Sequence, residues 1–271
     1  MLAANPFATL SGALSPGFMQ GYVILMVVLV AAGTLFDVVH KGSARYFFEN
    51  WRRSRSRKDA RELGGGELAS IAVKTAVVDV LASGEFCNMR RRIAHLLGMY
   101  GFILYVVSTA FLVFDPEPAG LMVSLWWIGA AMICVGGYWF WFFIRVDVAA
   151  EGHSPFRIVK ADLFILSLLA SATLGLVWAL AGGGAGVLFG LYLLATTVLF
   201  AGVPWSKFAH MFFKPAAAFE KRVSEANGTA ENLPTLTRDD PEQQKRHSME
   251  LLREAPMNMG LGIKREAPRH Y

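Results

Sequence analysis

Two of the six histidines stand where long apolar segments meet basic residues. His95 lies in the stretch RRRIAHLLGMYG, and His210 lies in PWSKFAHMFFKP. Two neutral imidazoles on separate helices can bind an iron porphyrin from its two sides, which is how a low-spin b-type haem is held. The pair therefore predicts one haem b, with His95 and His210 as axial ligands of its iron. The alternative is that each histidine caps a helix or binds water at a membrane boundary.

Residues close to these two histidines have the properties that a haem would need. Gly98 follows His95 by three positions, on the same face of a helix, where a missing side chain lets a flat ring approach. The basic residues Arg91, Arg92 and Lys207 lie near the two histidines and could neutralise the haem propionates. Basic residues are also expected at this boundary without any cofactor.

A third histidine, His40, ends the first apolar segment and lies one helical turn after Asp37. It could replace either haem ligand or help form a quinone site with Asp37. The alternative is that the two side chains only solvate the end of a helix.

Composition indicates the kind of element that must position these residues. The 271 residues are 54% hydrophobic and 17% charged, with a mean hydropathy of +0.41, whereas soluble domains are about 25% charged. The apolar residues form blocks long enough to cross a bilayer core of about 30 Å as helices. We expect five spans, at about 18–39, 93–114, 121–144, 163–181 and 186–205.

The basic residues predict how these spans are oriented. Residues 41–92 hold 12 of the 26 Lys and Arg residues, 145–160 hold 3 and the part from Lys207 onward holds 11. Because cytoplasmic loops carry the excess of Lys and Arg, the N-terminus is expected outside and the C-terminus inside. With five crossings, His95 and His210 come to a similar depth near the inner face.

The expected organisation is an all-α, five-helix membrane bundle with polar parts on both sides. Residues 1–17 form an external segment, 18–215 form the membrane domain with a cytoplasmic basic loop at 41–92, and 216–271 form a polar, flexible cytoplasmic tail. Within the basic loop, residues 67–81 are expected to form a helix. It lies either on the membrane surface or under the bundle.

Other function classes find little support. No His, Asp, Glu, Lys or Arg occurs in the outer half of any expected span, which argues against a channel, a proton path or a two-haem wire. Two cysteines, Cys87 and Cys134, cannot hold an iron–sulfur cluster alone. We expect no nucleic-acid partner, because the basic residues follow the membrane topology.

The two histidine segments, together with the number and order of helices over about residues 18–215, resemble the five-helix gamma-type cytochrome b subunits of respiratory complexes. This group includes nitrate reductase gamma chains and the membrane subunit of heterodisulfide reductase. Within it, the chain most resembles the membrane anchors associated with dissimilatory adenylylsulfate reductase. Full gamma chains bind two haems through two histidines on each of two helices, whereas each matching segment here offers one, so at most one haem is expected.

The resemblance implies a multi-pass subunit of the bacterial inner membrane without a substrate active site of its own. Such a subunit would pass electrons between a cytoplasmic iron–sulfur flavoenzyme, adenylylsulfate reductase, and membrane quinone. Arg52, Arg53, Arg55 and Arg57 would meet an acidic patch on that enzyme. The alternatives are a haem-free scaffold that tethers the enzyme and, with less support, a small transporter for a sulfur oxyanion.

Overall fold

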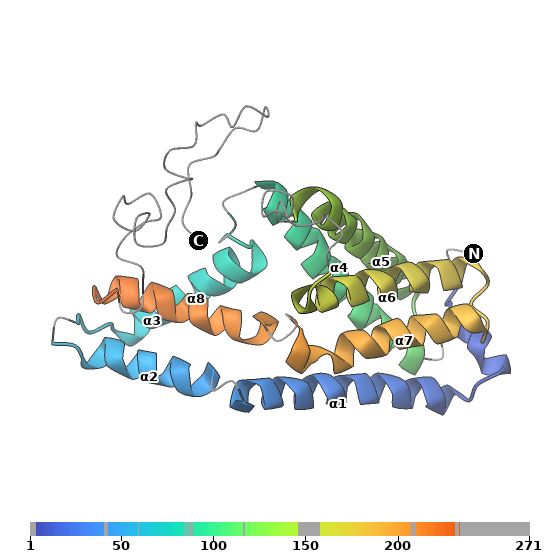
Figure 1. Ribbon diagram of the computed structural model, residues 1–271, viewed down its shortest axis with the longest axis horizontal. Helices are drawn as coiled ribbons and strands as arrows, with labels where there is room; N and C mark the ends of the chain where they lie inside the picture. Colours follow the sequence, from blue (N-terminus) through green and yellow to red (C-terminus); the bar gives the residue numbers. More distant parts are fainter. Residues whose placement is uncertain are drawn as a thin grey trace.

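The computed structural model describes residues 4–40, 43–58, 60–84, 86, 89–115, 117–145, 158–206, 210–230 and 233. Throughout these ranges the regular secondary structure is helical, which confirms the expected all-α class (Figure 1). The principal helices are α1 (Pro16–His40), α2 (Ser43–Ser56), α3 (Gly65–Lys74), α4 (Met89–Phe114), α5 (Gly120–Trp139), α6 (Leu163–Leu180), α7 (Val187–Ala201) and α8 (His210–Ala226).

Within the part of the chain that the structure describes, four helical segments are long and apolar enough to cross a membrane: α1, α4, α6, and α5 continued by the π-helix η3 to Ile144. They coincide with the first four expected spans, and a lipid bilayer is the environment that they indicate. The fifth expected span, 186–205, contains α7, which has 15 residues, and the short 3-10 helix η5 (Val203–Trp205).

Helices α4 and α5 pack against each other at four small residues. A Cβ added to Gly129 would lie 2.6 Å from the amide nitrogen of Tyr105, and 2.9 Å from the carbonyl oxygen of Gly101. A Cβ added to Gly136 would lie 2.8 Å from the carbonyl oxygen of Ala94. The two contact positions are seven residues apart on each helix, so the backbones touch at two levels, as membrane helices with small interface residues do.

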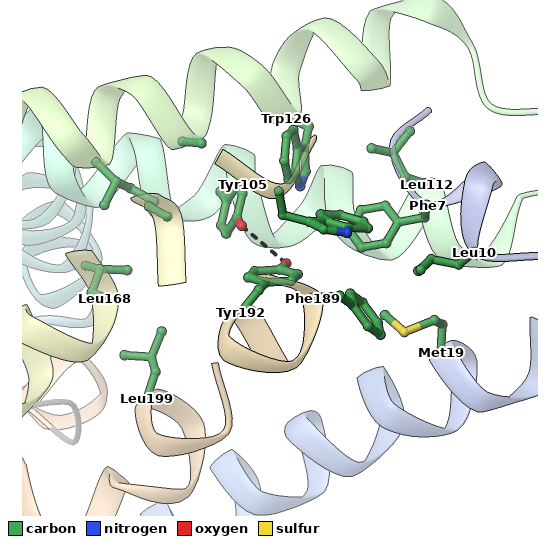
Figure 2. Packing of buried hydrophobic residues seen from close by; sticks show 14 of the residues in the cluster. Phe7, Leu10, Met19, Tyr105, Leu112, Trp126, Leu168, Phe189, Tyr192 and Leu199 are labelled. Carbon is green, nitrogen blue, oxygen red and sulfur yellow. Dashed lines mark hydrogen bonds between the residues drawn. The ribbon is translucent and has the colours of Figure 1, made fainter. Parts of the chain in front are cut away.

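Buried aromatic side chains fill the end of the bundle near the N-terminus (Figure 2). The ring of Phe7, from the N-terminal segment, lies 6.0 Å from that of Trp126 and 5.2 Å from that of Trp178. Thr9 beside it donates a hydrogen bond of 2.7 Å to the carbonyl of Gly183, between α6 and α7. The expected external segment therefore packs into the bundle through residues 5–12.

At the opposite end, α2, α3, the π-helix η2 (Thr75–Leu81) and α8 pack together; we call this group the polar module (Figure 1). In Figure 1, α2 continues the line of α1 beyond the bundle. The rings of Trp51 in α2 and Phe219 in α8 stack with their centroids 5.8 Å apart. The structure thus differs from the expected flexible tail at residues 216–226, which belong to α8 and pack within the module.

The helix expected at 67–81 exists as α3 and η2, with a change to π geometry at Thr75, and it packs against α8. Its other side exposes Val73, Val77 and Leu81, so its position at the membrane surface stays a prediction. Most of the expected tail beyond Ala230 lies outside the described residues.

Candidate functional site

His95 lies in the second turn of α4, half-buried, where the chain returns from the polar module to the bundle. Its Nδ1 atom lies 3.0 Å from the hydroxyl oxygen of Ser83, and its ring centroid lies 4.8 Å from that of Phe86. Ser83 is 1% exposed and has a φ of +48°, a conformation that costs free energy in a residue other than glycine. A buried hydroxyl thus positions the imidazole.

The turn that carries Ser83 is held against one side of α4. Arg92 donates a hydrogen bond of 2.7 Å from Nε to the carbonyl of Ala82, and the hydroxyl of Tyr100 donates one of 2.8 Å to the carbonyl of Leu81. Arg92, expected beside a haem propionate, therefore uses its Nε atom to fix the turn. With His95 between them, these residues join the end of η2 to the start of α4.

Helix α8 approaches the same turn. The ammonium group of Lys214 lies 6.0 Å from the ring centroid of Phe86, which is the ring that packs on His95. His210 is the first residue of α8, one helical turn before Lys214. The fold therefore brings the start of α8 toward the His95 turn, although the side chain of His210, and all of Lys207, lie outside the described residues.

The remaining expected site residues are placed as follows. A Cβ added to Gly98 would meet no atom within 4 Å, so there is open space on that side of α4. Arg91 is half-buried near the start of the same helix.

His40 is exposed and stacks on Phe36, with 5.2 Å between centroids and 8° between ring planes, while Asp37 is 1% exposed. His40 thus faces the surface, and Asp37 does not.

The fit of a haem can be tested at His95. An axial histidine is oriented by a hydrogen bond from its other ring nitrogen to an oxygen, as Ser83 provides on the Nδ1 side. At Gly98, three residues further along α4, an added methyl group would meet no atom within 4 Å. The contact with Ser83 is therefore what fits His95 to the role of a haem ligand. Among the described residues, no three His, Cys, Asp or Glu side chains form a group that could hold a metal ion by itself.

Sequence reasoning missed Ser83 and Phe86. Both lie between the predicted helix at 67–81 and the predicted span at 93–114, in a connection without a recognisable motif. The only hint in the sequence is the Ser83–Gly84 pair, which is typical of a turn.

The polar module carries a second feature, an exposed basic face on and just after α2. We define the basic face as Arg45, Arg52, Arg53, Arg55, Arg57 and Lys58, all exposed. A hydrogen bond and the charge of Arg45 lower the pKa of Glu49, the acidic residue within this stretch. The guanidinium of Arg55 also lies 4.8 Å from the ring centroid of Trp51. The face is therefore strongly positive, at the end of the molecule farthest from the N-terminal segment (Figure 1).

No protein-family model matches this sequence, and the searches of curated proteins and of solved structures likewise found no match.

Proposed function

We propose that this protein is a membrane anchor and electron-transfer subunit. It links a cytoplasmic iron–sulfur flavoenzyme, adenylylsulfate reductase, to membrane quinone through one haem b at His95 and His210. The observation that carries this proposal is the 3.0 Å contact between the buried Ser83 hydroxyl and Nδ1 of His95. A metal-binding histidine is oriented by a hydrogen bond at its other ring nitrogen, and the buried Ser83 hydroxyl supplies that bond here.

The residues of the chain would share the work as follows. Ser83 holds the His95 ring in one orientation, and the Phe86 ring packs against it at an interplanar angle of 40°. Arg91 and Lys207 would neutralise the haem propionates. When bound, the haem would carry single electrons between the docked enzyme and quinone. Substrate chemistry would remain on the docked flavoenzyme, which this chain binds and orients.

A dithionite-reduced minus oxidised spectrum of the purified, haem-supplied protein tests the haem. We expect a b-type alpha band that is lost in both His95→Ala and His210→Ala and kept in His247→Ala, a matched histidine of the tail. Loss of the band in His40→Ala but not in His210→Ala would make His40 the second ligand. A folded wild-type protein without any band would overturn the haem and leave a scaffold.

The same proposal includes five spans, with the N-terminus outside and the polar module in the bacterial cytoplasm. Helix α7 and η5 together would form the fifth crossing; α7 alone is about 22 Å long. The basic face lies at the opposite end of the molecule from the N-terminal segment, as the positive-inside rule requires. Fusions test this: a fluorescent protein after Ala230 should be bright, and alkaline phosphatase inserted at Gly183 should be active. If the fluorescent fusion is dark and the phosphatase is inactive, the protein has the opposite orientation in the membrane.

The basic face would dock the flavoenzyme through acidic groups on its surface. Purified adenylylsulfate reductase should bind the detergent-solubilised protein, with an affinity that falls as salt is raised. The triple variant Arg52→Glu, Arg53→Glu, Arg55→Glu should slow association by about tenfold or more. Lys160→Glu, a charge change of the same sign away from the polar module, should bind as the wild type does. If the triple variant and Lys160→Glu bind the reductase equally well, α2 has no role in docking.

A haem-free scaffold is the second candidate function, and the basic face favours it independently of any cofactor. It predicts that the flavoenzyme binds through the basic face while no alpha band is seen. The difference spectrum and the binding measurement together therefore distinguish an electron-transfer subunit from a haem-free scaffold.

A further inference from the structure

The basic face of α2 surrounds one aromatic side chain, Phe48, which is 58% exposed. Three arginines of the basic face share its side of the helix, because they follow at intervals of three or four residues. We call this row, exposed throughout, the Phe48 stripe: Arg45, Phe48, Arg52 and Arg55. Asn50 and Ser54 lie on another side of α2 and are each 2% exposed, so that side packs within the polar module and the stripe faces outward.

Positive charge is concentrated around the stripe. Residues 43–58 hold six Lys and Arg residues and one Glu, so they carry five net positive charges, as many as the formal net charge of the whole chain. A second copy of the chain would bring the same charges to the stripe and be repelled. A surface that covers the stripe must therefore present acidic groups.

Contacts within α2 hold the side chains of the stripe in place. The Nε atom of Arg52 lies 3.4 Å from the carbonyl oxygen of Phe48, and the guanidinium of Arg55 lies 4.8 Å from the ring centroid of Trp51. The Phe48 ring meets the ring of Phe47 edge to face, with 5.4 Å between centroids and 78° between planes. Side chains positioned before binding lose less conformational entropy when a partner covers them.

The direction of α2 argues against the bilayer as the surface that covers the stripe. Helix α2 continues the line of α1, which is long and apolar enough to cross a membrane (Figure 1). Ten residues separate Arg45 from Arg55, so the stripe extends about 15 Å away from the bundle and does not run along a membrane surface. Aromatic residues of a membrane-surface helix enter lipid, whereas Phe47 and Trp51 are half-buried here and Trp51 stacks on Phe219 of α8.

We propose that Phe48 is the apolar anchor of a protein-docking site, and that the partner presents an apolar pocket ringed by acidic residues. Aromatic and Arg side chains contribute most of the binding energy in many interfaces, and the contacts around them exclude water. Phe48 enters the pocket, and the three arginines of the stripe meet the carboxylates around it. This inference rests on the proposed docking of adenylylsulfate reductase, and it names the side chain that keeps the reductase bound.

The kinetics of binding test the anchor, with purified adenylylsulfate reductase passed over the full chain in detergent. Phe48→Ala should raise the dissociation rate constant by at least about tenfold. Its association rate constant and salt dependence should match the wild type, because every charge is kept. Phe48→Leu should recover most of the loss, and Val73→Ala, a control at a 63% exposed residue of α3, should behave as the wild type. Size-exclusion elution confirms folding. Equal dissociation rates for the wild type and Phe48→Ala overturn the proposal.

An environment-sensitive NBD fluorophore at Phe48→Cys shows what covers this position. The chain also carries Cys87→Ser and Cys134→Ser, so that one thiol is labelled. In nanodiscs that contain phosphatidylglycerol, we expect its emission to rise only after reductase is added. High emission in nanodiscs before that addition shows contact with the membrane. In detergent without reductase, high emission shows contact with a second copy if it depends on protein concentration, and contact with the same chain if it does not. Each of these three results overturns the proposal.

Failure of this inference can be told apart from failure of the proposed function. Reductase binding with equal dissociation rates for the wild type and Phe48→Ala overturns the anchor alone. Absence of any binding by the wild type overturns the anchor together with the docking part of the proposed function. The difference spectrum of the haem is unaffected by either result.

Discussion

Arg222 of α8 forms a two-point ion pair with Asp79 of η2, with 2.5 Å between Nε and Oδ2 and 2.7 Å between Nη2 and Oδ1. The Asp79 side chain is 9% exposed and that of Arg222 is 23% exposed, so water screens the pair only in part. This contact joins two segments 143 residues apart in the sequence. It fixes α8, and with it the position of His210, relative to the turn that holds His95.

Asp79→Asn should loosen α8 from η2. The substitution leaves a partly buried guanidinium without its carboxylate, which costs about 1–3 kcal/mol of local stability. Hydrogen exchange of the amides of residues 216–226 should become faster. The exposed pair Arg45–Glu49 gives a control, since Arg45→Gln should leave hydrogen exchange in α8 unchanged. Recovery in the double variant Asp79→Arg, Arg222→Asp would show that charge pairing is responsible, and unchanged exchange in Asp79→Asn would refute the role.

Gly129→Ala should destabilise the bundle. The new methyl group would stand 2.6 Å from a backbone nitrogen of α4, so the two helices must separate, at a cost of about 1–3 kcal/mol. Gly190→Ala is the matched control, because its Cβ meets no atom within 4 Å and alanine favours a helix by up to about 1 kcal/mol. Thermal unfolding in one detergent should give a lower midpoint for Gly129→Ala only. Equal midpoints would mean that α4 and α5 pack less closely than described.

Ser83→Ala should weaken the haem binding proposed at His95. Loss of the group that orients a metal-binding histidine typically lowers affinity by about 10–100-fold. Haem titration followed by absorbance measures this directly. Ser83→Gly separates two effects, because glycine accepts a φ of +48° but also lacks the hydroxyl. Both variants should bind haem equally weakly, with Ser83→Gly the more stable, while Ser124→Ala on the surface of α5 should bind normally.

Asn227→Ala should open the C-terminal end of the polar module. The buried side chain of Asn227 donates to the hydroxyl of Ser54 over 2.8 Å and accepts two hydrogen bonds from Thr229. Removing it takes the acceptor from the buried backbone amide of Thr229, while the hydroxyls of Ser54 and Thr229 can still bond each other over 3.1 Å, and costs about 1–3 kcal/mol. Limited proteolysis should then cleave the module faster. Asn227→Asp keeps both acceptor contacts and loses only the donor, so its cleavage rate should fall between those of the wild type and Asn227→Ala. A wild-type cleavage rate in Asn227→Ala would contradict this role of Asn227.

Hydropathy and charge, which are local properties of the sequence, determined the helical class, the four helices long and apolar enough to cross a membrane and the basic stretch that follows α1. They could do so because a bilayer selects helices about twenty apolar residues long, whatever the rest of the chain does. His95 was likewise visible in the sequence, as an imidazole at a boundary between arginines and an apolar run.

Only the tertiary structure decided what surrounds these elements. Ser83 reaches His95 because a strained turn folds back on α4, and Arg222 reaches Asp79 because α8 continues past Pro215 and packs on η2. An apolar groove lined by α1, α4 and α7 exists because α1 packs mainly on α7 and η5 and leaves space beside α4. Such features depend on contacts between residues far apart in the chain. Hydropathy and spacing carry no information about them, since many packings satisfy the same apolar pattern.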